Sequence, residues 1–91
     1  MNAVETRTYD IVLFGATGFT GGLTAQYLAA HAPRELRWAI AGRSQAKLAE
    51  LKAQLSAAQP HCAAVGLIEA QLEDAASLQR MAAQALSLIH I

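Results

Sequence analysis

The sequence predicts an α/β fold in which helices cover both faces of a parallel, doubly wound sheet. Short apolar segments alternate with segments of helical periodicity, and a glycine-rich turn follows the first apolar segment. Such strand–helix–strand units join parallel strands through right-handed crossovers. The 91 residues suffice for one domain. We expect about four strands and three helices, which is fewer than the about six strands of a complete sheet of this type.

The first unit begins with Tyr9–Phe14, a β-branched and aromatic run that stops at a glycine. Such a run is typical of a buried strand. The helix that follows should end before Pro33, because proline cannot continue a helix. Large apolar residues recur at helical spacing along it, and we expect them to face the sheet: Phe19, Leu23, Tyr27 and Leu28.

The second unit repeats this order. The run 36–41 is the second expected strand, Gly42 and Arg43 form its turn, and Ser44 can cap the next helix. That helix should close at Gln59 and Pro60. Its expected inward face consists of Leu48, Leu51, Leu55 and Ala58.

A third unit is less marked. The run 63–70 predicts a strand that alanine and glycine weaken, and Asp74 can cap the third helix. The final run 86–91 predicts a fourth strand. The third helix should turn a set of apolar residues inward: Leu78, Met81, Ala82 and Ala85.

Composition excludes several classes of protein. Seven Lys and Arg residues balance seven Asp and Glu residues, so no basic excess suggests a nucleic-acid partner. The single cysteine, Cys62, cannot form an internal disulfide, and the first residues contain no signal-peptide run. We therefore expect a cytoplasmic protein. No run reaches the roughly 18 apolar residues of a membrane span, which leaves peripheral association with a membrane open.

The most informative motif is a G-x-x-G-x-x-G loop between the first strand and the first helix. A phosphate could approach its backbone N–H groups there, beside the positive end of the helix. A lone glycine triplet is weak evidence, but its position after a strand and before a helix predicts a Rossmann-like nucleotide site. We expect Gly15 to allow the turn, Gly18 to admit the pyrophosphate, and Gly21 to let the helix pack on the strand. The whole candidate loop is Gly15, Ala16, Thr17, Gly18, Phe19, Thr20 and Gly21.

The end of the second strand predicts the choice of cofactor. A site selective for NAD places an Asp or Glu there, on the ribose 2′-hydroxyl. This chain has Gly42, Arg43 and Ser44 instead. A guanidinium can bind a 2′-phosphate through its planar fork. NADP is therefore expected rather than NAD, with Lys47 as a further candidate phosphate ligand.

Other residues suggest no chemistry of their own. His31, His61, Cys62 and His90 lack the spacing of a metal site, so no metal is expected. We can name no catalytic acid, base or nucleophile, and no nucleophile elbow or kinase loop is present. Cys62, Tyr27 and Trp38 are expected to be core residues.

Residues 9–21, with 36–44 and Lys47-Leu48, resemble the NADP-binding domain of saccharopine-dehydrogenase-like oxidoreductases. The bacterial branch that includes the trans-acting enoyl reductases of mycobacterial glycolipid synthesis is the most similar. The resemblance implies a longer parent protein with a second domain for the substrate. Of this parent, residues 1–91 would be a partial cofactor domain with a lead-in at 1–8.

The resemblance also implies departures. The family usually has an acid beside the adenine where this chain has Gln71, and a Val-rich strand where residues 87–91 look like foreign sequence. It implies hydride transfer to a lipid-type or other small organic substrate. A non-catalytic NADP-binding regulator or scaffold is the alternative, because a fold alone does not decide function.

Overall fold

A computed structural model of the chain describes residues 8–33, 35–71 and 73–90. Most of the expected lead-in, 1–7, and the last residue of the expected fourth strand, 91, lie outside these ranges. The described residues form one sheet of four parallel strands in the order β3-β2-β1-β4. This confirms the expected α/β, Rossmann-like fold. The strands are β1 (Tyr9–Phe14), β2 (Trp38–Gly42), β3 (Gly66–Glu69) and β4 (Ala85–His90).

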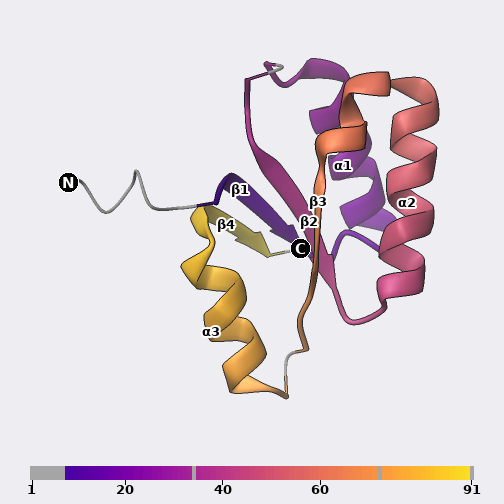
Figure 1. The fold of residues 1–91 in the computed structure, drawn as a ribbon. Helices are drawn as coiled ribbons and strands as arrows, with labels where there is room; N and C mark the ends of the chain where they lie inside the picture. The colour runs from indigo at the N-terminus through magenta and orange to yellow at the C-terminus, as the bar shows by residue number, and fades with distance from the viewer. Residues whose placement is uncertain (1–7, 34, 72, 91) are drawn as a thin grey trace.

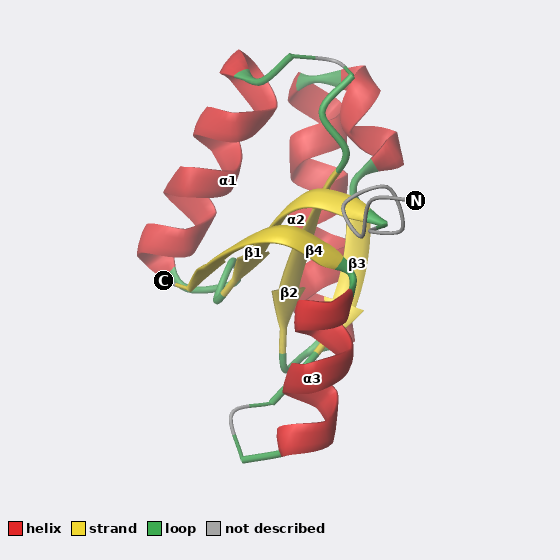
Figure 2. Ribbon diagram, turned by 90° about the vertical axis from the view of Figure 1, so that its left-hand side faces the viewer, coloured by secondary structure: helices red, strands yellow, loops and turns green. Residues whose placement is uncertain are grey.

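Helices cover both faces of this sheet (Figure 1). The helices are α1 (Phe19–His31), α2 (Gln45–Ala58) and α3 (Ala75–Ala83), with a short 3-10 helix η2 (Pro60–Ala64) before β3. Two of them, α1 and α2, lie on one side, and α3 lies on the other, nearest the viewer in Figure 2. Each side has its own core: Leu13 and Ile40 point to the first, and Val12 and Ala39 to the second.

The strand order reverses beside β1. The chain moves from β1 to β2 to β3 in one direction, and α3 then carries it back across the sheet to β4 on the other side of β1. In a parallel sheet, ligands bind at the carboxyl ends of the strands where the order reverses. Phe14 at the end of β1 has Ala41 of β2 on one side and His90 of β4 on the other. A ligand site is therefore expected at this edge of the sheet.

Two helices begin at the caps that the sequence predicts. The Ser44 Oγ accepts a hydrogen bond of 3.3 Å from the Lys47 backbone N–H at the start of α2. At the start of α3, Asp74 Oδ1 accepts from the N–H groups of Ala76 and Ser77 at 3.1 and 3.3 Å. Each side chain satisfies donors that the first turn of a helix leaves unpaired.

Helix α1 faces the opposite way from our expectation. Phe19, Leu23 and Tyr27 are 84%, 52% and 65% exposed, and only Leu28 of the expected set is partly buried against the core. The buried stripe consists of small residues, Gly21, Ala25 and Ala29. Tyr27 is thus not a core residue, whereas Trp38 is buried as expected. The helix buries small residues because it lies very close to the end of β1.

Gly21 shows how close this approach is. A Cβ built on Gly21 would overlap the carbonyl oxygen of Gly15 and lie 2.8 Å from the Cα of Ala16. Both obstacles are backbone atoms, which cannot rotate away as a side chain can. The role that the sequence suggested for this glycine, packing of helix against strand, fits this contact.

Smaller differences concern the later elements. The expected strand 63–70 is the end of η2 followed by a strand of 4 residues. Cys62 lies buried in η2, and this burial raises the pKa of its thiol.

The inward faces of α2 and α3 agree with the expectation in part. On α2, Leu48, Leu51 and Leu55 are buried but Ala58 is exposed. On α3, Met81 is buried, Leu78 is partly buried and Ala82 is exposed, and the buried Ala85 already belongs to β4. Ser77, which the sequence did not single out, is buried as well.

Substituting Gly21→Ala should destabilise the fold. The added methyl group meets backbone on two sides, and overpacking of this kind costs typically about 2 kcal/mol or more. Gly22→Ala is the matched control, because its Cβ would have only Ala16 O within contact range, at 3.7 Å. Chemical denaturation should show a lower free energy of unfolding for the first variant only. Equal stability of the two variants would contradict the close packing of α1 on β1.

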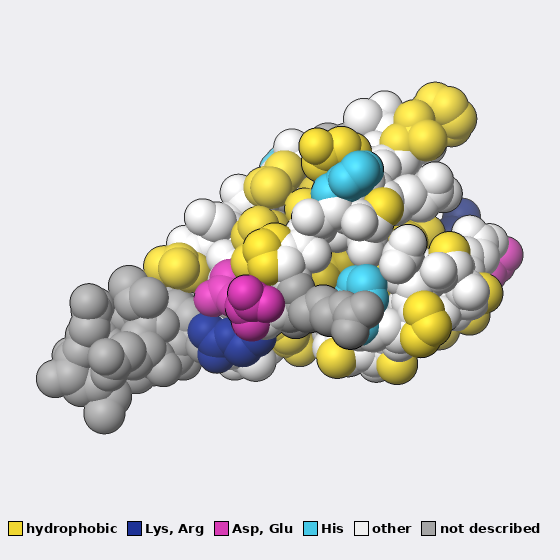
Figure 3. Space-filling model, turned by 90° about the horizontal axis from the view of Figure 1, so that it is seen from above, with side chains coloured by type: hydrophobic (Ala, Val, Ile, Leu, Met, Phe, Trp, Pro, Cys, Tyr) yellow, Lys and Arg dark blue, Asp and Glu magenta, His cyan; other side chains and the backbone are white. Residues whose placement is uncertain are grey.

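At the amino edge of the sheet, Asp10 accepts hydrogen bonds from the Arg37 backbone N–H at 2.9 Å and from its Nη2 at 3.1 Å. On the face in Figure 3, acidic and basic side chains adjoin at one place and the rest is mostly apolar or uncharged. Hydrogen bonds from the Arg37 backbone and side chain lower the pKa of Asp10. The charged carboxylate therefore stabilises the fold above its ordinary pKa of about 4, and this contribution disappears as the pH falls through the lowered pKa.

In thermal unfolding, the melting temperature of Asp10→Asn should accordingly lie below that of the unmodified protein at pH 7. The two melting temperatures should converge in strong acid. A difference that stays constant across the acid range would contradict the assignment to the ionised carboxylate.

Candidate functional site

A cavity of about 370 Å³ lies at the carboxyl edge of the sheet. Its walls come from the ends of β1, β2 and β4 and from the segments that follow β1, β2 and β3. Pockets for small molecules and cofactors have volumes of about 300 Å³ and upward. The lining residues are Phe14, Gly15, Thr17, Gly18, Gly42, Arg43, Ala70, Gln71, Glu73 and His90.

The glycine loop forms the floor nearest β1. Gly15 has a φ of 92°, a conformation that side chains disfavour, and its N–H donates to the carbonyl oxygen of Ala41 at 2.9 Å. The N–H of Gly18 donates back to Gly15 O at 3.1 Å. The loop is thus a tight turn tied to the end of β2. It brings the start of α1 to the mouth of the cavity.

The amino end of α1 differs from those of the other two helices. No side chain among the described residues caps it, and Gly18 takes the cap position. The N–H of Gly22 is bonded to Gly18 O at 2.8 Å, which leaves the N–H groups of the preceding turn without a partner in the helix. Unpaired N–H groups and the helix dipole together favour an anion.

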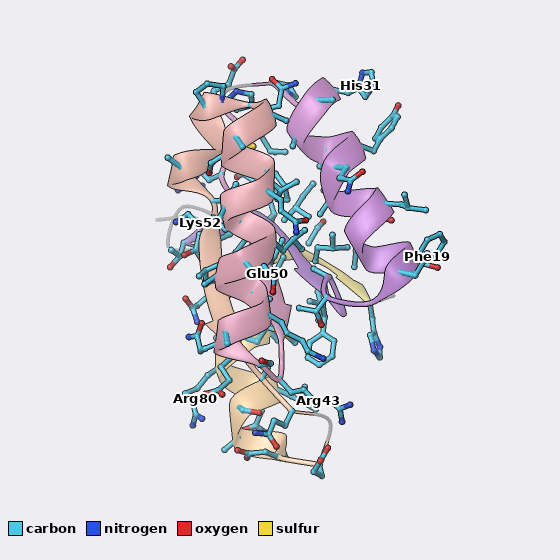
Figure 4. All side chains as sticks on the ribbon, turned by 90° about the vertical axis from the view of Figure 1, so that its right-hand side faces the viewer. Phe19, His31, Arg43, Glu50, Lys52 and Arg80 are labelled. Carbon is cyan, nitrogen blue, oxygen red and sulfur yellow. The ribbon has the colours of Figure 1, made fainter. Side chains whose placement is uncertain are left out.

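Arg43 supplies a positive charge at the end of β2. The side chain is exposed and makes no hydrogen bond or ion pair with any residue the structure describes. Figure 4 shows it extending away from the start of α2. Glu73 lines the same cavity from the segment after β3, so the lining holds one acidic and one basic side chain besides His90. The guanidinium is therefore available to a ligand.

The predicted binding residues divide into three groups. Gly15, Thr17, Gly18, Gly42 and Arg43 line the cavity. A second hollow, a groove of about 390 Å³, lies between α1 and α2 and is lined by residues of the glycine loop and of both helices. Ala16, Phe19 and Lys47 line only this groove, whereas Thr17 and Gly18 border both. Thr20, Gly21 and Ser44 line neither, and the contacts of Gly21 and Ser44 belong to the packing and capping of helices.

The wall opposite the glycine loop consists of residues that the sequence did not propose as ligands. Ala70, Gln71 and Glu73 follow β3, and Ala70 N–H donates to Gly42 O at 2.9 Å. The signal for them was available, because every strand end of a parallel sheet reaches the same edge. Gln71 occupies the place where the family resemblance implies an acid.

Among the residues that the structure describes, no group of three or more His, Cys, Asp or Glu side chains could hold a metal ion. None of the helices in this part of the chain has the length and apolar character of a membrane span.

Comparison with known proteins identifies relatives. Residues 11–91 match the family model described as saccharopine dehydrogenase NADP binding domain. A trans-acting enoyl reductase of Mycobacterium tuberculosis (strain ATCC 25618 / H37Rv) is 44% identical over 79 residues, which are 87% of this chain and 18% of the relative. Saccharopine dehydrogenase-like oxidoreductases of Homo sapiens and Mus musculus are 38% and 37% identical, over 91% of this chain and 21% of theirs. The chain thus spans about a fifth of the length of these curated relatives. No solved structure matches.

Proposed function

Because the chain belongs to the saccharopine dehydrogenase NADP-binding domain family, we propose that the cavity at the carboxyl edge holds the adenosine and pyrophosphate portion of NADP(H). The family assigns NADP as the cofactor. The observation that carries the location is the meeting of an uncapped helix end and an unpaired guanidinium in one cavity.

The residues present fit the two kinds of phosphate in the cofactor. The glycine loop and the first turn of α1 offer backbone N–H groups to the pyrophosphate, with Gly18 at the position of closest approach. Arg43, one strand away at the end of β2, offers a planar fork to the 2′-phosphate. Lys47, which lies in the first turn of α2, lines the groove beside the start of α1 and adds a positive charge there. Ser44 caps α2 and is not assigned a contact with either phosphate.

The bound cofactor would supply the hydride of an oxidoreductase reaction. We propose that the protein reduces a C=C bond of a lipid-type substrate, because the relative named an enoyl reductase is more similar than those named saccharopine dehydrogenase-like. Substrate groups and any membrane-surface contact would then come from residues beyond this domain. The greater length of the relatives supports that division.

Substituting Arg43→Ala should weaken NADP much more than NAD. Loss of a charge-assisted bidentate contact is expected to cost about 2 kcal/mol, or roughly 30-fold in Kd, and NAD has no 2′-phosphate to lose it. Lys52→Ala, which removes the same charge from the partly exposed side of α2, is the control. Isothermal titration calorimetry measures the affinities of the unmodified protein and the two variants for both cofactors. Equal losses for both cofactors, or an equal effect of the Lys52 variant, would refute the role of Arg43.

The reaction is tested on a longer protein that contains this domain together with a substrate domain, by following the oxidation of NADPH in the presence of an α,β-unsaturated acyl thioester. We expect turnover that NADH supports poorly, since it lacks the phosphate that Arg43 binds. A protein that binds NADPH tightly and oxidises it with neither this thioester nor a saccharopine-type imine would favour the non-catalytic regulator.

A further inference from the structure

Ser77 is the one polar side chain that is buried among the described residues, with 6% of its surface exposed. It lies on α3, in the first turn, and its Oγ is within 2.9 Å of Asp74 O and 3.3 Å of Gln71 O, either of which can accept its proton. The same Oγ accepts a hydrogen bond of 3.0 Å from the Gln71 backbone N–H. One hydroxyl thus links the helix to the segment that follows β3.

The link from Gln71 is not a requirement of the helix. Asp74 already caps α3, and the bond between Ser77 and Asp74 O is the local kind that serine makes within a helical turn. The bond from Gln71 N spans six residues and fixes the backbone at the wall of the cavity. The neighbouring Ala70 is held from the other side, by Gly42 O. Gln71 therefore has its backbone fastened while its exposed side chain remains at the cavity.

We propose that Ser77 is a positioning residue for cofactor binding, which holds Gln71 so that its side-chain amide contacts the adenine of NADP(H). This rests on the proposed function of the cavity. An amide offers one donor and one acceptor side by side, and the edge of adenine presents the complementary pair. A carboxylate in the same place could only accept. The hydroxyl of Ser77 thus acts on the ligand through Gln71, without touching it.

The test is a double-mutant cycle on the affinity for adenosine 2′,5′-bisphosphate, measured by calorimetry. We expect Ser77→Ala and Gln71→Ala each to weaken binding about fivefold to tenfold, in line with one lost hydrogen bond. If Ser77 acts through Gln71, the double variant should bind no more weakly than the weaker single variant. A loss in the double variant equal to the product of the two single losses would overturn the proposal, as would unchanged affinity in either single variant.

Three further variants separate positioning from folding. Ser77→Thr keeps the hydroxyl and should bind within about twofold of the unmodified protein. If Ser77→Ala does not fold, Ser77→Cys replaces it with a group of similar size that accepts hydrogen bonds poorly, and should still weaken binding. Ser56→Ala, a serine of α2 that does not line the cavity, should have no effect. Failure of the unmodified protein to bind the bisphosphate would refute the proposed function itself, whereas normal binding by Ser77→Cys would refute this inference alone.

Discussion

Helix α1 packs directly on the backbone that follows β1, and this contact sets the position of the candidate site. Gly21 has no space for a side chain, because the carbonyl of Gly15 and the backbone of Ala16 occupy it. This contact fixes where α1 begins and therefore where its unpaired N–H groups lie. It also explains the small residues Ala25 and Ala29 further along the same stripe. A larger residue at Gly21 would move the helix, and the mouth of the cavity would move with it.

The three helices use their amino ends differently. Ser44 and Asp74 satisfy the first turns of α2 and α3, whereas α1 starts at Gly18 with no side-chain cap. Capping contributes about 1 kcal/mol, so the bare end of α1 forgoes stability that the other two helices have. An anion at that end would restore the missing interactions. The guanidinium of Arg43 resembles the start of α1 in this respect. It too is a polar group without a partner among the described residues, and it lies at the edge where the strands end.

The sequence predicted the elements better than their faces. Local patterns predicted strand β1, the helix caps Ser44 and Asp74, and the alternation of strands with helices. Each of these depends on residues that are close together in the chain. For α1 we predicted that the large apolar residues face the sheet, and this was wrong, because the small residues of the helix are the buried ones. Gly21 and Phe19 are two positions apart, or about 200° around a helix, so a Gly21 packed on β1 requires an exposed Phe19. Burial of Ser77 could not be predicted, since it depends on where the segment after β3 passes over α3.

We propose that NADP binds at the carboxyl edge of the sheet, between the glycine loop and Arg43. Amide chemical shifts measured by NMR during titration with NADP test it most directly. Binding at this edge should cause the largest changes at Gly15, Gly18, Arg43 and Gln71, because these residues line the cavity. Changes concentrated instead on Gln26, Glu50 and Gln54, which line the groove between α1 and α2 and not the cavity, would contradict it.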